Sequence, residues 1–224
     1  MSSSKTLRSA APPPIPYPFY FVFILGWLAF LTIVHNVKFI TADMSVFDPE
    51  FRDKYSVQWH LVMTHGVAAM IALAIGPVQF VESWRKRWRG LHRMLGRVYI
   101  IALLLAAPTG FFMGLMAYGG LLSQSAFVVF SILWFVTACL GYHTACKRKF
   151  AEHRVWMIRS YALTFGAVIL RVQLNLLQDF GFRFEVVYPY MAWCSWIPAV
   201  LIGELVVRKM YRFLPQSGQI LHPA

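Results

Sequence analysis

Charged residues are scarce in this sequence, and acidic residues are the scarcer kind. Charged side chains make up 13% of the 224 positions, against about 25% in soluble domains. Hydrophobic residues make up 58% and are spread along almost the whole chain. A sizeable soluble domain is therefore excluded, and the composition indicates a protein that crosses a membrane several times.

Cysteines and catalytic motifs are also few. The three cysteines, Cys139, Cys146 and Cys194, lie inside apolar stretches without paired spacing, which argues against a disulfide framework or a zinc site. The sequence has no HExxH, P-loop or Gly-x-Ser-x-Gly motif, and no cluster of carboxylates inside an apolar stretch. These absences count against protease, NTPase and proton-pump functions.

Six apolar stretches approach the roughly 20 residues that a helix needs to cross the hydrocarbon core. They cover approximately residues 18–35, 61–82, 93–118, 124–146, 155–178 and 188–207. The stretches predict an all-α, polytopic membrane bundle of six transmembrane helices over residues 18–207. We expect a disordered cytoplasmic tail over 1–17 and a cytoplasmic tail over 208–224. Prolines fall within three predicted helices, where kinks are tolerated.

The basic residues define an expected orientation. A net charge of +12 would suggest a nucleic-acid partner in a soluble protein, but here the basic residues lie mainly at the ends of apolar stretches. Fifteen Lys and Arg residues fall on the side that holds segments 83–97 and 147–154 and both tails, and four fall on the other side. The positive-inside rule then places both termini in the cytoplasm. We expect membrane lipids as partners and no nucleic acid.

A short motif occurs twice. His92-Arg93 and His153-Arg154 lie 61 residues apart, and each pair is followed by an arginine and a tyrosine at the start of an apolar stretch. The repeat predicts a duplicated helical hairpin, with a four-helix core from the second to the fifth helix and the other two helices outside it. Chance similarity between two basic helix starts is the alternative.

The repeated histidines suggest a haem b site near the cytoplasmic face. His92 and His153 would ligate the iron, each with its other ring nitrogen held by a neighbouring group. Arg93 and Arg154 would pair with the propionates, and His143 is close enough to the same membrane face to substitute as a ligand. The alternative is that each His-Arg pair marks a helix entry whose side chains contact lipid phosphates.

The fifth predicted helix carries a line of polar residues. Ser160, Thr164, Arg171, Asn175 and Gln178 fall on one face at 100° per residue. This face must contact protein or a cavity, because an arginine exposed to lipid is costly. Hydrogen bonding between helices is the structural alternative to a binding site.

Depth in the membrane limits the partners of this polar face. Arg171 and His65 are expected near the same outer level, so His65, Arg171, Asn175 and Gln178 predict an outer polar pocket for a quinone or another small molecule. Near the inner level, Arg159 is expected to pair with Glu204 on the sixth helix. That pair would remove two uncompensated charges at once.

Several strings resemble a bacterial family of predicted membrane proteins that is catalogued as a domain of unknown function, number 2306. The resemblance covers about residues 60–207 and rests on His65-Gly66, Gly76-Pro77-Val78-Gln79-Phe80, Leu91-His92-Arg93, Gly96-Arg97-Val98-Tyr99 and the string from His153 to Phe165. The resemblance implies a bacterial inner-membrane protein, and it implies nothing about the activity of the protein.

The hairpin repeat also looks like the transmembrane cytochromes of the ascorbate-reducible, haem b type. Those proteins typically hold two histidine pairs, one per leaflet. This chain matches only the inner pair, His92 and His153, because Ala126 stands where a repeat partner of His65 would lie.

Two functions remain open on the sequence. The first is a haem b electron-transport protein of the membrane. The second is a non-redox membrane protein that binds a lipid, a carrier or a partner subunit through the polar face of the fifth helix. A small-molecule transporter is a weaker alternative, since no broken-helix Gly/Pro pair occupies corresponding positions in the two halves.

Overall fold

The computed structural model describes residues 19–40 and 57–212, and every regular element within these ranges is helical. The elements in order are α1 (Phe19–Asn36), the 3₁₀ turn η1 (Val37–Ile40), α3 (Trp59–Phe80), α4 (Glu82–Arg87), α5 (Arg89–Leu115), α6 (Leu121–Cys146), α7 (Phe150–Asp179), α8 (Phe184–Cys194) and α9 (Ile197–Arg212). The predicted tail over 1–17, and the predicted C-terminal tail beyond residue 212, lie outside the described residues.

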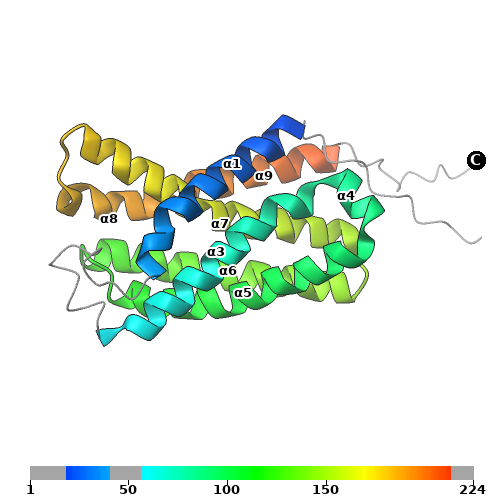
Figure 1. Cartoon of the computed structure of the whole chain (residues 1–224), viewed down its shortest axis with the longest axis horizontal. Helices are drawn as coiled ribbons and strands as arrows, with labels where there is room; N and C mark the ends of the chain where they lie inside the picture. Colours follow the sequence, from blue (N-terminus) through cyan, green and yellow to red (C-terminus); the bar gives the residue numbers. More distant parts are fainter. Residues whose placement is uncertain (1–18, 41–56, 213–224) are drawn as a thin grey trace, which may run out of the picture.

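Within the described residues, five segments are long and apolar enough to cross a membrane: α3, α5, α6, α7 and the pair α8–α9. The first predicted span, α1, is a shorter apolar helix. The chain is therefore an all-helical polytopic membrane protein, and the predicted fold class is confirmed (Figure 1). A bilayer favours helical segments because a helix satisfies its own backbone hydrogen bonds without water.

The sixth predicted span differs from the prediction, since it is two helices rather than one. Helix α8 ends at Cys194 and α9 begins at Ile197. Pro198 explains the interruption, because it has no N–H to donate to the carbonyl of Cys194 and its ring crowds that carbonyl.

Pro77 lies inside α3 without ending it. Its missing N–H leaves the carbonyl of Leu73 without a helical donor. The hydroxyl of Tyr161, on α7, donates to that carbonyl at 3.5 Å. A neighbouring helix thus supplies the donor that the proline removes, as expected for prolines tolerated inside a membrane bundle.

The four-helix core is present as predicted. Helix α3 packs against α5, α5 against α6, and α6 against α7, while α3 also contacts α7 and so closes the ring. Helix α1 packs outside the ring against α3 and α7, α8 against α6 and α7, and α9 against α7. In this arrangement α5 and α7 face each other diagonally across the core.

The repeat extends to the helix boundaries. Helices α5 and α7 begin at Arg89 and Phe150, which are 61 residues apart like the two motifs, and His92 and His153 are each the fourth residue of their helix. Helix α1 begins, and α9 ends, at the end of the bundle that carries α4 (Figure 1). We call this the α4 end; the turn between α5 and α6 marks the opposite end.

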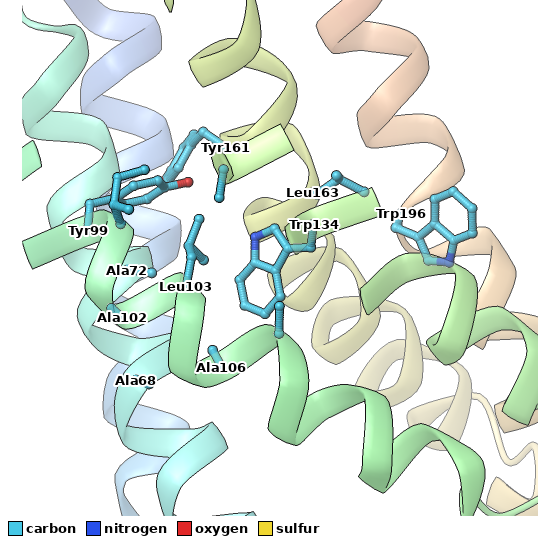
Figure 2. Packing of buried hydrophobic residues seen from close by; sticks show 13 residues of the cluster. Ala68, Ala72, Tyr99, Ala102, Leu103, Ala106, Trp134, Tyr161, Leu163 and Trp196 are labelled. Carbon is cyan, nitrogen blue, oxygen red and sulfur yellow. The ribbon is translucent and has the colours of Figure 1, made fainter. Parts of the chain in front are cut away.

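Small residues allow close packing of α3 on α5. Ala68 and Ala72 of α3 and Ala102 and Ala106 of α5 are buried in one cluster with Leu103 (Figure 2). Without side chains beyond Cβ, two membrane helices can approach closely, which is the main source of helix association in lipid. The three cysteines are free and carry no disulfide.

Candidate functional site

A cavity of about 480 Å³ lies toward the end of the bundle opposite α4. Its walls come from the end of α1, η1, α3, the end of α5, the α5–α6 connection, α6, α7 and the start of α8. Small-molecule sites in proteins usually have volumes of about 300–1,000 Å³. The cavity is therefore large enough to accept a ligand head group with part of an apolar tail.

Aromatic side chains form much of the cavity wall. They come from two helices, α6 and α8, and from the α5–α6 connection: Tyr118, Phe130, Trp134, Phe184 and Tyr188. The ring centroids of Phe184 and Tyr188 are 4.7 Å apart, and those of Phe130 and Trp134 are 5.3 Å apart. Such packed rings offer a flat apolar surface, and most small-molecule sites are lined in this way.

The polar groups of the cavity are mainly basic or neutral. His65 and Arg171, which the sequence places at the same depth, line this one cavity together with Lys38, Asn36 and Thr164. None of its described lining residues is acidic. The described part of the wall therefore attracts a ligand group that is anionic or accepts hydrogen bonds.

The residues of the predicted polar face of α7 lie in different environments. Ser160 and Thr164 are buried in the core, whereas Arg171 is exposed at the mouth of the cavity. Asn175 and Gln178 are exposed and are not among the described lining residues. These residues share one side of the helix, but neighbouring helices cover that side only along the first half of α7.

Backbone contacts fix the position of His65. Its Nδ1 lies 2.8 Å from the carbonyl oxygen of Ala106, on α5. A Cβ added to Gly110, one turn further along α5, would lie 2.9 Å from Cε1 of His65. The absence of a side chain at Gly110 therefore makes room for the ring. The ring also contacts Trp134 edge-on, with centroids 6.3 Å apart.

Sequence reasoning missed Ala106 and Gly110 as determinants of the site. The signal that could have found them is the spacing of small residues along α5. Ala102, Ala106, Gly110 and Gly114 follow one another at intervals of four, which marks one helix face as a close-packing surface. What that face contacts is decided by the fold.

A closed hydrogen-bond network lies beneath the cavity. Oγ1 of Thr164 donates to the carbonyl of Ser160 at 3.0 Å and accepts from Nε1 of Trp134 at 2.9 Å. The hydroxyl of Tyr99, on α5, lies 3.0 Å from the same oxygen and 3.1 Å from Oγ of Ser160. Figure 2 shows Tyr99 and Trp134 among the buried side chains of this region.

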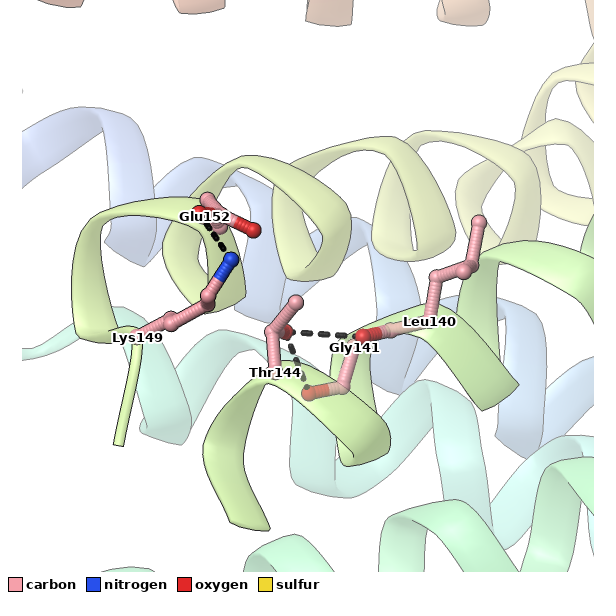
Figure 3. A network of polar contacts seen from close by, with 5 residues as sticks. All are labelled: Leu140, Gly141, Thr144, Lys149 and Glu152. Atoms are coloured by element: carbon pink, nitrogen blue, oxygen red, sulfur yellow. Dashed lines mark hydrogen bonds and ion pairs between the residues drawn. The ribbon is translucent and has the colours of Figure 1, made fainter. Parts of the chain in front are cut away.

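At the α4 end, the two repeated histidines occupy equivalent helix positions with different neighbours. Nδ1 of His153 lies 2.8 Å from the carbonyl of Gly141, on α6. The same carbonyl accepts the Thr144 hydroxyl at 3.0 Å (Figure 3). His92 instead lines a crevice of about 10 Å³ with Gln79, Trp84, Arg85 and Trp88. The charges of the two histidines interact, and the charge of Arg85 acts on both.

The remaining residues of the predicted haem site do not share one environment. Arg93 is exposed and its Nε contacts the carbonyl of Arg89, whereas Arg154 is buried. His143 is exposed near the end of α6. The charge of Arg154 acts on Glu82 of α4, whose pKa is held below its usual value first of all by a hydrogen bond from Lys86. No three His, Cys, Asp or Glu side chains gather into a metal site within the described ranges.

The predicted pair of Arg159 and Glu204 is present. Nη2 and Nε of Arg159 lie 2.9 and 3.0 Å from Oε2 of Glu204, which ties α7 to α9. The guanidinium group of Arg159 also lies over the ring of Trp156, 4.9 Å from its centroid.

Comparison with known families shows which family the chain matches. A family model described as "Predicted membrane protein (DUF2306)" matches residues 62–207. The matched range begins in α3 and ends in α9, so it takes in the four-helix core, His65, Arg171 and both repeated histidines. No curated protein and no solved structure matches the chain.

Proposed function

The chain belongs to the DUF2306 family of predicted membrane proteins, and from that premise we propose that it binds a membrane-soluble small molecule in the cavity beside His65 and Arg171. The family description names a membrane protein and no reaction. The proposal therefore rests on the geometry of the cavity. Its occupant is an amphiphile, either a quinone-type carrier or an acyl lipid.

One observation carries this proposal: His65 and Arg171, from different helices, line the same cavity of about 480 Å³. The basic groups lie in a wall that is otherwise largely aromatic and aliphatic. A few placed polar groups in an apolar cavity are typical of a site that orients one end of a ligand. The polar head of the amphiphile lies at His65 and Arg171, and its apolar part lies against the aromatic wall.

The test is to identify what the purified protein retains. Organic extracts of the detergent-purified protein would be analysed for quinones and lipids by mass spectrometry. The Arg171→Ala and Ala69→Trp variants should retain several-fold less of the bound molecule, because the first removes a polar contact and the second fills the cavity. Val172→Ala is the matched control, since Val172 is exposed beside Arg171 and is not among the described lining residues. Equal retention by all four proteins would overturn the proposal.

A haem b site at His92 and His153 is the second candidate. It is favoured by the contact between Nδ1 of His153 and the Gly141 carbonyl, because iron-ligating histidines usually donate their other ring N–H to such a group. Nε2 of His153 would then be the ligand atom. The crevice beside His92, about 10 Å³, has room for little more than a water molecule, so haem binding requires α5 and α7 to separate at this end.

An absorption spectrum tests the haem candidate. Protein expressed with haem supplementation would be recorded before and after dithionite reduction. A Soret band that is lost in His153→Ala and kept in His143→Ala would support the site, since His143 is exposed. Absence of the band from the wild-type protein would exclude it.

We also propose that the α4 end faces the cytoplasm of a bacterium, with the protein in the inner membrane. The basic residues of α4, of the start of α5 and of the α6–α7 turn all lie at this end. Basic residues are retained on the cytoplasmic side during insertion.

A further inference from the structure

The backbone of α5 sets the tautomer of His65. Nδ1 of His65 lies 2.8 Å from the carbonyl oxygen of Ala106, and a carbonyl oxygen only accepts hydrogen bonds. The ring hydrogen is therefore on Nδ1. In the neutral imidazole, Nε2 then carries a lone pair and acts as an acceptor.

The same contacts determine which ring nitrogen a ligand meets. The edge of the ring that holds Nδ1 and Cε1 faces Ala106 and Gly110 of α5. Nε2 has no hydrogen bond to the described residues. Since His65 lines the cavity, Nε2 is the atom that it offers to an occupant.

Arg171 and Lys38, the other basic groups of the cavity, differ from His65 because they can only donate hydrogen bonds. The charge of Arg171 also acts on His65, and a second positive charge beside it in apolar surroundings is unfavourable. A ligand at this site therefore gains a hydrogen bond if it presents a donor to His65, and the basic residues can donate to a second ligand oxygen.

We infer that the cavity selects a quinol-type ring, whose hydroxyl group donates to Nε2 of His65 while its second oxygen accepts from Arg171 or Lys38. This inference rests on the proposed function and names the ligand class of the same site. The aromatic wall accommodates the flat ring. The oxidised quinone and an ionised fatty acid carry acceptors only, so either one leaves Nε2 without a partner.

Binding of three probes to the detergent-purified full chain tests the inference. The probes are a decyl benzoquinol under anaerobic, reducing conditions, the matching decyl benzoquinone, and oleate, each titrated calorimetrically at neutral pH. We expect the wild-type protein to bind the quinol about tenfold more tightly than the quinone, as one buried hydrogen bond commonly contributes. Oleate should bind no more tightly than the quinone.

The His65→Phe variant separates this role from a structural one. Phenylalanine keeps a ring at the position, and the Ala106 carbonyl still accepts the Thr109 hydroxyl at 3.1 Å. Quinol binding should weaken about tenfold, to the quinone value, while quinone binding stays unchanged. His60→Phe is the matched control, because His60 is exposed on the same helix and is not among the described lining residues.

The outcomes distinguish the two proposals. Equal binding of quinol and quinone by the wild-type protein, tighter binding of oleate, or a quinol preference that survives in His65→Phe would overturn the inference and leave the cavity as a ligand site. Absence of binding by all three probes would overturn the inference, and the retention experiment above would then decide the proposed function by itself.

Discussion

The hydroxyl of Tyr99, on α5, lies 3.0 Å from Oγ1 of Thr164, on α7, and joins two helices that face each other across the core. Because Thr164 donates its own hydrogen to the Ser160 carbonyl, it accepts from Tyr99 and also from Trp134. The Ser160 hydroxyl can in turn donate to the Tyr99 oxygen. Every donor of this buried network thus has an acceptor, which is the condition for burying polar groups at low cost.

Replacing Tyr99 with phenylalanine should destabilise the bundle without opening a large cavity. We expect the free energy of unfolding to fall by about 1–2 kcal/mol, because the bonds from the hydroxyl to Ser160 and Thr164 are lost. Denaturant unfolding in detergent, followed by circular dichroism, measures the change. Tyr190→Phe is the control, since Tyr190 is 60% exposed. An equal effect of both substitutions would contradict the role of the network.

Gly76 should tolerate no larger side chain. A Cβ at this position would lie 1.9 Å from Cε2 of Tyr161, so Gly76→Ala must displace the ring that donates to the Leu73 carbonyl. We expect a loss of about 1–3 kcal/mol, typical of overpacking. Gly90→Ala is the matched comparison, because no atom lies within 4 Å of a Cβ there. Thermal unfolding should separate the two variants clearly, and indistinguishable midpoints would count against the packing.

The ion pair between Arg159 and Glu204 should contribute more than the ion pair between Lys149 and Glu152. The side chains of the first pair are 30% and 33% exposed, and those of the second are 56% and 49% exposed. Alanine double-mutant cycles should give a coupling of about 1 kcal/mol for the first pair and under about 0.5 kcal/mol for the second, because solvent screens exposed charges. A larger coupling for Lys149 and Glu152 would refute this ranking.

Cysteine labelling in whole cells should reveal the orientation. With the three native cysteines replaced by alanine, Leu121→Cys marks the end opposite α4 and Phe150→Cys marks the α4 end; both native side chains are exposed. An impermeant maleimide should label position 121 in intact cells and position 150 only after permeabilisation, as the positive-inside rule requires. The reverse pattern would show the opposite orientation.

The membrane fold could be predicted from the sequence because a bilayer leaves few choices. A stretch of about 20 apolar residues must become a helix to satisfy its backbone, whatever its neighbours are. The predicted pair of Arg159 and Glu204 followed from the same constraint, since two charges at one depth have few other partners. Breaks inside a span were harder to foresee, because Pro77 and Pro198 are the same residue with different outcomes. Both prolines leave a carbonyl that a side chain of α7 reaches, Tyr161 at Leu73 and Gln173 at Cys194, so this contact does not explain why the helix continues past Pro77 and stops before Pro198.

The candidate site was also predictable only in part from the sequence. The sequence by itself determined that His65 and Arg171 lie at a similar depth, because depth follows from position along a helix of known rise. The tertiary structure decided that they line one cavity, that Asn175 and Gln178 lie outside its described wall, and that Ala106 orients the imidazole of His65. Those facts depend on which helix faces which, and in lipid that choice is made by close packing of small residues such as Ala106 and Gly110 rather than by the hydrophobic pattern.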